Sequence, residues 1–295
     1  MRYTPLSSPT HSSVSRADSS PNLGEQPRIQ PAPAHSSPKL GEVPAGRRSV
    51  STRGSLFSIF NSQFSILFFF LLLVSCRPAC QYPDDKFWAH GATGVGLGRN
   101  AEELFGGRME VDINYSDYRD SLFLGHDLCD TAKGLTLDAW LDSLRHPADN
   151  WYWLDLKNLT TANAPRVAHR LCCAARRHGI LSRAMVESQN DTALRTLRDS
   201  GLHVILWVDN PWWSGVSEEQ WLENTRRQVQ RLHPDALSGD YHNYPRLPDA
   251  FPRENLHIWD TPRDDNDTNR AHSLMIAAHP AVKVVLLDYP EPPKS

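Results

Sequence analysis

The sequence has little lysine, few cysteines and almost no net charge. Its formal charge is −3 over 295 residues, which predicts neither a nucleic-acid-binding surface nor an acidic tail. No apolar run reaches the about 20 residues of a membrane-spanning helix, and the unbroken run at residues 66–74 is much shorter. Tryptophan, in contrast, is frequent, with nine residues. Most tryptophans pack in protein cores, but this number also suggests aromatic-lined cavities.

The five cysteines do not have the spacing of a zinc site. Cys76 lies in the amino-terminal region, and the other four are Cys80, Cys129, Cys172 and Cys173. Some of them can pair if the protein is exported, although the adjacent Cys172 and Cys173 cannot easily bond to each other. We interpret these two as structural.

Residues 1–55 predict a low-complexity, disordered leader. Ser, Pro, Gly, Arg and Ala dominate this part, and a polar near-repeat at residues 19–25 returns at residues 36–42. Such a composition cannot bury enough apolar surface to offset the entropy lost on ordering. Two copies are also too few for a repeat fold.

Residues 56–76 predict a signal peptide or signal anchor. Arginines 47, 48 and 53 precede the apolar run, which ends in Leu73-Val74-Ser75-Cys76. This order is typical of a secretory signal, and its end resembles the bacterial lipobox, in which the cysteine is lipidated. We therefore expect a membrane-anchored lipoprotein of the cell envelope, periplasmic or outer-surface, attached through Cys76. A plain signal anchor, a slightly longer membrane helix and cleavage with secretion are the alternatives.

After a linker at residues 77–86, residues 87–295 predict a (β/α)8 barrel of the TIM type. Short apolar runs alternate with segments of helical periodicity, which indicates parallel strands with helical crossovers. Eight strands over about 200 residues fit such a barrel. The expected strands are Phe87–His90, Arg108–Ile113, Tyr152–Lys157, Ala184–Ser188, His203–Val208, Ala236–Asp240, Leu256–Asp260 and Val282–Leu287, with an inserted hairpin or loop at Ser121–Gly125.

Five segments between the expected strands have the pattern of amphipathic helices. They are residues 137–144 after a capping Thr136, and residues 164–178, 192–200, 217–232 and 266–278. Ser217 followed by Gln220 is a capping-box pattern.

An open, doubly wound sheet is the alternative to the barrel. It would carry a glycine-rich phosphate loop, and residues 91–98 are rich in glycine. The third glycine, however, is misplaced for a dinucleotide-binding fingerprint, and no convincing helix is expected after it.

Nearly every expected strand ends in a polar or ionisable residue. In a barrel these ends converge on one face, where such enzymes carry out their chemistry; in other folds they would be ordinary loop residues. They are His90, Asp112, Asp155, Glu187, Asp209, Asp240, Asp260 and Asp288.

Glu110 and Asp112 are the strongest candidates for a metal site. Two residues apart on a strand, they point to the same side, which in a barrel is the interior. Two ionised carboxylates there repel and are costly to desolvate unless a cation or proton neutralises them. Because neither thiolates nor a histidine-rich set accompanies them, Mg²⁺ or Ca²⁺ fits better than zinc. An ordinary surface strand with alternating charges is the other interpretation.

Asp155 and Lys157 repeat this geometry on the next strand. Asp155 can supply a third ligand and Lys157 can neutralise an anionic substrate, although an internal salt bridge explains the pair equally well. His90 and His126 flank the first acid pair in the sequence, and histidine suits proton transfer near neutral pH.

The order of these motifs resembles the superfamily of glycerophosphodiester phosphodiesterases and phosphatidylinositol-specific phospholipase C-like enzymes. The motifs are His90-Gly91, Glu110-x-Asp112, His126-Asp127 and Asp155-x-Lys157, followed by a late strand ending in Trp259 and a closing strand ending in Asp288-x-Pro290. The resemblance spans about residues 87–290.

The resemblance implies a metal-dependent phosphodiesterase acting on glycerophosphodiesters or (lyso)phospholipid head groups. Glu110, Asp112 and Asp155 would bind one divalent cation, and His90 and His126 would act as general base and acid. Lys157, Glu187 and Trp259 would contact the substrate. An internal hydroxyl of the substrate would attack phosphorus, giving a cyclic intermediate.

Two features depart from the glycerophosphodiesterase pattern. Gly91 stands where an arginine usually follows the first histidine, and the stretch between His90 and Glu110 leaves little room for a full first helix. The motifs also look like those of the sphingomyelinase D-like and menorin-like branches, so the substrate stays open. A noncatalytic binding protein that keeps the barrel is the alternative function. An unrelated barrel glycosidase, pairing one acid with Asp155, Glu187 or Asp240, is a third.

Overall fold

A closed ring of eight parallel strands forms the centre of the fold. The computed structural model describes residues 80–244, 246–259 and 267–289. Within them the barrel order is β1-β2-β4-β5-β6-β7-β8-β9, and β1 pairs with both β2 and β9. The strands are β1 (Phe87–Ala89), β2 (Arg108–Ser116), β4 (Trp151–Leu156), β5 (Ala184–Ser188), β6 (His203–Trp207), β7 (Ala236–Asp240), β8 (Leu256–Trp259) and β9 (Val282–Leu287). The predicted (β/α)8 barrel is confirmed, and because β1 closes the ring the open-sheet alternative is wrong.

One further strand, β3 (Ser121–Leu124), lies outside the ring. It pairs antiparallel with the carboxyl-terminal half of β2, from Ile113↔Leu124 to Ser116↔Ser121. This hairpin is the predicted insertion. It places the loop after β3 beside Asp112, midway along β2, because the Gly125 N–H donates to the Asp112 carbonyl at 3.0 Å.

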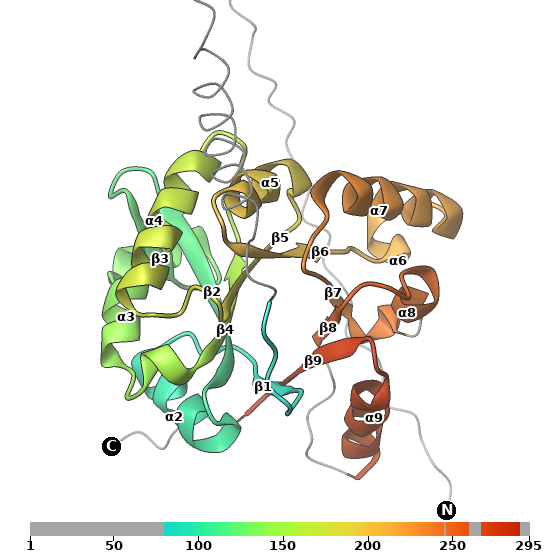
Figure 1. Ribbon diagram of the computed structural model, residues 1–295, viewed down its shortest axis with the longest axis horizontal. Coiled ribbons are helices and arrows are strands. Elements are labelled where there is room, and N and C mark those ends of the chain that lie inside the picture. The colour runs from blue at the N-terminus through green and yellow to red at the C-terminus, as the bar shows by residue number, and fades with distance from the viewer. Residues whose placement is uncertain (1–79, 245, 260–266, 290–295) are drawn as a thin grey trace, which may run out of the picture. The chain divides into compact units, whose positions relative to one another are not determined.

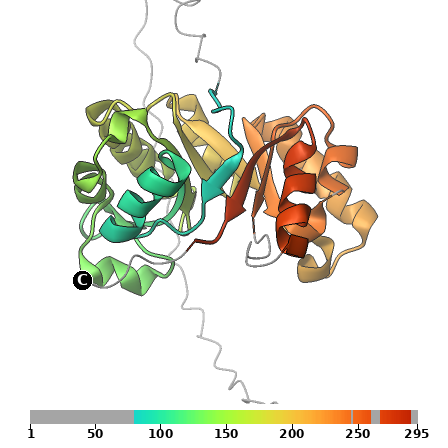
Figure 2. The same cartoon turned by 90° about the horizontal axis from the view of Figure 1, so that it is seen from below.

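Helices surround the ring, as Figure 1 shows. In Figure 2, α2 to α5 lie on one side of the strands and α7 to α9 on the other. The helices are α2 (Val95–Phe105), α3 (Leu137–Ser143), α4 (Ala164–Arg177), α5 (Asp191–Asp199), α6 (Pro211–Ser214), α7 (Glu218–Leu232), α8 (Arg246–Ala250) and α9 (Asp267–Ala278), with short 3₁₀ turns η1 (Leu128–Lys133), η2 (Pro147–Asp149) and η3 (Tyr241–Asn243).

The expected caps start two of these helices. The Thr136 hydroxyl accepts the Ala139 N–H at 3.2 Å ahead of α3, and the Ser217 hydroxyl accepts the Gln220 N–H at 3.3 Å ahead of α7. Each satisfies one of the backbone donors that a helix start leaves unpaired.

The expectation of no helix after the glycine-rich stretch is wrong. Helix α2 follows it directly and contains Gly96 and Gly98. Glycine lowers helix propensity, but Gly98 lies against Trp140 and Leu144 of the next helical segment, where an added Cβ would meet both side chains at 2.9 Å. Tertiary packing therefore requires the small residue that local propensity disfavours.

Alternation along the strands separates two apolar layers. Val111, Leu154 and Leu156 pack outward against the helices in the larger core. Trp153, Ile205 and Leu286 pack inside the ring in a smaller one. The acids at positions 110, 112 and 155 share the inward face, as their spacing predicts.

The segment before β1 packs against the interior of the ring. Cys80 and Tyr82, in the stretch assigned to a linker, pack against this interior core. The Tyr82 hydroxyl lies 3.0 Å from Nε2 of His257, a fully buried residue of β8.

Several predictions fall on residues 1–79, outside the described part. They are the leader at 1–55, the signal segment at 56–76 and the lipidation of Cys76. No helix in the described ranges combines the length and apolar character needed to cross a membrane. Within those ranges, Cys129, Cys172 and Cys173 are free thiols.

Candidate active site

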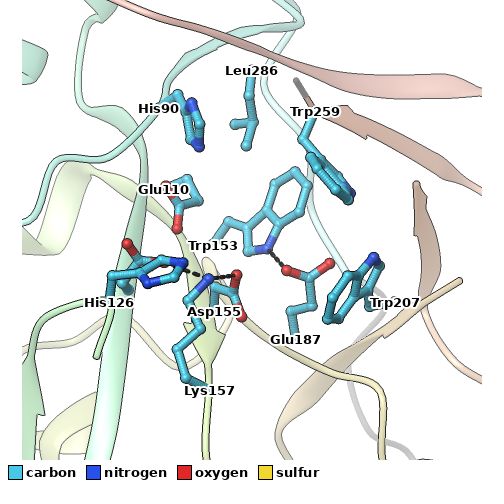
Figure 3. A pocket seen from close by; sticks show the side chains of 11 residues that line it. His90, Glu110, His126, Trp153, Asp155, Lys157, Glu187, Trp207, Trp259 and Leu286 are labelled. Atoms are coloured by element: carbon cyan, nitrogen blue, oxygen red, sulfur yellow. Dashed lines mark hydrogen bonds and ion pairs between the residues drawn. The ribbon is translucent and has the colours of Figure 1, made fainter. Parts of the chain in front are cut away.

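A cavity of about 320 Å³ opens at the carboxyl ends of the strands. Eight of the predicted site residues line it, and Figure 3 shows their side chains converging from opposite sides of the ring. They are His90, Glu110, Asp112, His126, Asp155, Lys157, Glu187 and Trp259, joined by Trp153, Trp207 and Leu286.

Three carboxylates meet at one edge of this cavity. Asp112 and Asp155 are direct neighbours in the pairing of β2 with β4, and one oxygen each from these two residues and Glu110 lie within 4.8 Å of one another. Burial raises the pKa of Glu110 well above its usual range, and the charges of Asp112 and Asp155 raise it further. Burial also raises the pKa of Asp155, against the opposing effect of Lys157.

Lys157 supplies positive charge to this cluster. Its Nζ lies 2.7 Å from Oδ1 of Asp112 and 2.5 Å from Oδ2 of Asp155. Burial alone would lower the pKa of Lys157, but the two carboxylates outweigh it and raise the pKa. An ammonium has three protons to donate, so one remains for a substrate after both acids are satisfied.

The acid cluster fits a hard divalent cation. Oxygen ligands on opposite sides of Mg²⁺ are about 4.2 Å apart, and those of Ca²⁺ about 4.6–5.2 Å. The three carboxylate oxygens lie within 4.8 Å of one another, a limit that falls in the range for Ca²⁺ and is slightly wider than the span across Mg²⁺. Burial and the neighbouring acids raise the pKa of Glu110, and a cation or a proton would relieve the repulsion among these acids.

Gly91 orients Glu110. Its φ of +71° lies in the left-handed region, which glycine adopts without the steric penalty of other residues. In this conformation its N–H donates to Oε2 of Glu110 at 2.7 Å. The glycine at the position where glycerophosphodiesterases usually carry arginine thus has a backbone role here.

Each candidate histidine has a carboxylate at its Nδ1. His90 Nδ1 lies 2.8 Å from Oδ1 of Asp288, and His126 Nδ1 lies 3.1 Å from Oδ1 of Asp127. A carboxylate in this position favours a proton on Nδ1 and leaves Nε2 for proton transfer. The side chain of His126 is 70% exposed, compared with 41% for His90, so His126 is much the more accessible to solvent.

An aromatic wall faces the acids across the cavity. The rings of Trp207 and Trp259 meet edge to face, with centroids 6.0 Å apart. Between this wall and the acid cluster lies Glu187 (Figure 3), which accepts the Trp153 indole N–H at 2.9 Å and the Ser238 hydroxyl. Burial raises the pKa of Glu187 well above its usual range, and the charge of Asp155 adds to this.

The predicted site residues lie together at the cavity, but not every acid at a strand end lines it. Asp240 is buried and accepts the Asn210 amide at 2.7 Å, and it is not among the residues that line the cavity. Asp260 lies outside the described residues. Trp153 and Trp207 were missed as lining residues, although alternation from Asp155 places Trp153 on the inward face.

No protein-family model and no curated protein matches this sequence. Solved structures do resemble it. An Oleispira antarctica phosphodiesterase in complex with the product sn-glycerol-3-phosphate is 12% identical, with a TM-score of 0.54 over 70% of this chain and 93% of that chain. The chain has the barrel fold of this phosphodiesterase. A Silicibacter pomeroyi protein described as a glycerophosphoryl diester phosphodiesterase is 10% identical, with a TM-score of 0.50 over 71% and 92%. At these identities the likeness concerns the fold.

Proposed function

We propose that this protein is a metal-dependent phosphodiesterase acting on glycerophosphodiesters or (lyso)phospholipid head groups. The observation that carries the proposal is the grouping of three carboxylates, one lysine and two carboxylate-paired histidines around one cavity. A phosphodiester needs charge compensation at phosphorus and proton transfer at two oxygens. Acids with a cation and a lysine meet the first need, and the histidine pair meets the second.

The histidines divide the proton transfers between them. His90, oriented by Asp288, takes the proton of the attacking hydroxyl at Nε2. His126 gives a proton to the oxygen of the leaving group, which avoids release of an alkoxide. When the attacking hydroxyl belongs to the substrate itself, the first product is a cyclic phosphodiester.

Lys157 and the acid cluster hold the phosphate. Glu110, Asp112 and Asp155 would hold one Mg²⁺ or Ca²⁺, which when bound offsets negative charge on the phosphoryl oxygens. Lys157 donates a hydrogen bond from its third N–H to a phosphoryl oxygen, and Trp259 and Glu187 border the substituents of the diester. We further propose membership of the glycerophosphodiester phosphodiesterase superfamily, with the sphingomyelinase D-like and menorin-like branches as candidates.

A noncatalytic barrel is the second candidate, because Lys157 already bridges two of the three acids. A cluster neutralised in this way needs no cation. The two candidates differ in whether a divalent cation binds and whether a diester is cleaved.

Hydrolysis of sn-glycero-3-phosphocholine and lysophosphatidylcholine tests the proposal. Phosphorus NMR distinguishes monoester, cyclic and unreacted species. We expect turnover with Mg²⁺ or Ca²⁺, loss with EDTA, and recovery when the metal is returned. Glu110→Gln should remove activity, and Glu103→Gln, an exposed change in α2, should not. A folded protein that binds neither cation nor diester would support the noncatalytic candidate instead.

We also propose that Cys76 is lipidated and attaches the domain to the cell envelope. The support is the lipobox-like sequence at residues 73–76. In a bacterial host, Cys76→Ser should abolish incorporation of labelled palmitate and release the protein from membranes, whereas Cys173→Ser should do neither. Persistent membrane attachment of unlabelled Cys76→Ser would favour the signal-anchor alternative.

A further inference from the structure

A second cavity lies next to the acid cluster, away from the histidines. This side pocket has a volume of about 200 Å³ and shares Asp155, Lys157 and Trp207 with the main cavity. The remaining walls come from the last residues of β4 and β5 and the segments that follow them. Asp155 and Lys157 therefore border two adjoining spaces, and a phosphate held at Lys157 has room for a substituent in each.

The two spaces differ in chemistry. The main cavity presents the indole rings of Trp207 and Trp259, of which only Trp207 also borders the side pocket. The side pocket presents the hydroxyl of Ser188 and the amides of Gln189 and Asn190. A flat aromatic wall favours apolar or cationic groups, whereas hydroxyls and amides favour a ligand that carries oxygens.

The hydrogen bonds around the side pocket leave donors for such a ligand. The Ser188 hydroxyl accepts the Asn190 N–H at 3.3 Å, which does not use its own proton. The Asn190 side-chain oxygen accepts the Ala193 N–H at 3.0 Å and starts α5, so its NH₂ group is not involved in that contact. Gln189 is exposed, and its amide offers both donor and acceptor.

We propose that the side pocket binds a hydroxyl-bearing substituent of the phosphodiester, such as a polyol, through Ser188 and Gln189. The inference rests on the proposed function, because the phosphate must lie at Lys157 for its substituent to reach the pocket. Leu156 and Leu159 complete the wall, so the carbon chain of a polyol packs against apolar atoms while its hydroxyls face the polar side chains.

Binding of two phosphate monoesters of similar size tests the pocket without requiring turnover. The probes are sn-glycerol 3-phosphate and n-propyl phosphate, which differ in two hydroxyls, measured by isothermal titration calorimetry with Mg²⁺ present. Two added hydrogen bonds predict about tenfold tighter binding of glycerol phosphate. Gln189→Leu should remove most of this preference and leave propyl phosphate binding unchanged. Ser188→Ala should reduce the preference in the same direction.

Gln220→Leu, also an exposed change, in α7, is the matched control and should keep the preference. Equal affinity of the wild-type protein for both probes, or a preference that survives both side-pocket variants, would overturn the inference alone. Failure of the wild-type protein to bind either monoester would overturn the proposed function and this inference with it.

Discussion

His257 should make the barrel less stable as the pH falls below neutrality. The residue is fully buried, its Nε2 contacts the Tyr82 hydroxyl, and Nδ1 has no hydrogen-bond partner among the described residues. Burial lowers the pKa of His257 to about 3, although the charge of Asp235 opposes this. The folded state therefore keeps the imidazole neutral at pH values where an unfolded chain protonates it.

The sign and size of the effect follow from this difference. With an unfolded pKa of about 6.5, the unfolded state binds more protons than the folded state between about pH 6.5 and pH 3. The free energy of unfolding is thus unaffected above that window and falls as pH decreases through it. Between pH 7.5 and pH 5.0 the expected loss is about 2 kcal/mol.

Urea unfolding of wild-type protein and His257→Gln at both pH values measures the effect. Glutamine still offers a hydrogen bond to Tyr82 but does not titrate, so the variant should lose about 2 kcal/mol less than wild type over this pH step. His169→Gln, an exposed change in α4, should keep the wild-type dependence. The same pH dependence in wild type and His257→Gln would refute the reasoning.

Three further predictions concern the site and the first helix. Asp288→Asn should lower kcat by about a hundredfold, as expected for a misoriented general base, with KM nearly unchanged in steady-state assays; an unchanged kcat would exclude the orienting role. Lys157→Met should lower activity and yet increase the thermal stabilisation by Ca²⁺. Without the ammonium that bridges them, Asp112 and Asp155 should bind metal more tightly. A Ca²⁺-induced shift in melting temperature no larger than that of wild type would contradict this. Gly98→Ala should destabilise the fold by about 1–2 kcal/mol in urea unfolding, because the added Cβ meets Trp140 and Leu144. This cost outweighs a gain of about 1 kcal/mol in helix propensity. Gly96→Ala, an exposed change in the same helix, should be neutral or stabilising, and equal effects of the two substitutions would disprove the packing explanation.

The inward-facing residues could be predicted because strand alternation is strictly local. Once Asp155 is placed inside, Trp153 and Lys157 follow on the same face, and the same parity groups Glu110 with Asp112. Because the strands alternate with helices along the sequence, the polar residues at their carboxyl ends could be expected to meet at one end of the barrel.

Contacts made by closure of the ring could not be predicted in this way. The pairing of His90 with Asp288 joins residues 198 positions apart and depends on β1 lying beside β9. Gly91 illustrates the same limit. Its position in the sequence suggested only a missing arginine. Its backbone N–H donates to Glu110, and this contact could be predicted only if the φ of Gly91 were known.

The most direct test of the proposed site is a crystal structure grown with Mn²⁺ and sn-glycerol 3-phosphate. The grouping of Glu110, Asp112 and Asp155 predicts one anomalous peak within about 2.0–2.6 Å of an oxygen from each acid, with the phosphate between it and Lys157. A structure in which Lys157 still bridges Asp112 and Asp155, and no metal peak lies at the three acids, would contradict the metal-dependent phosphodiesterase.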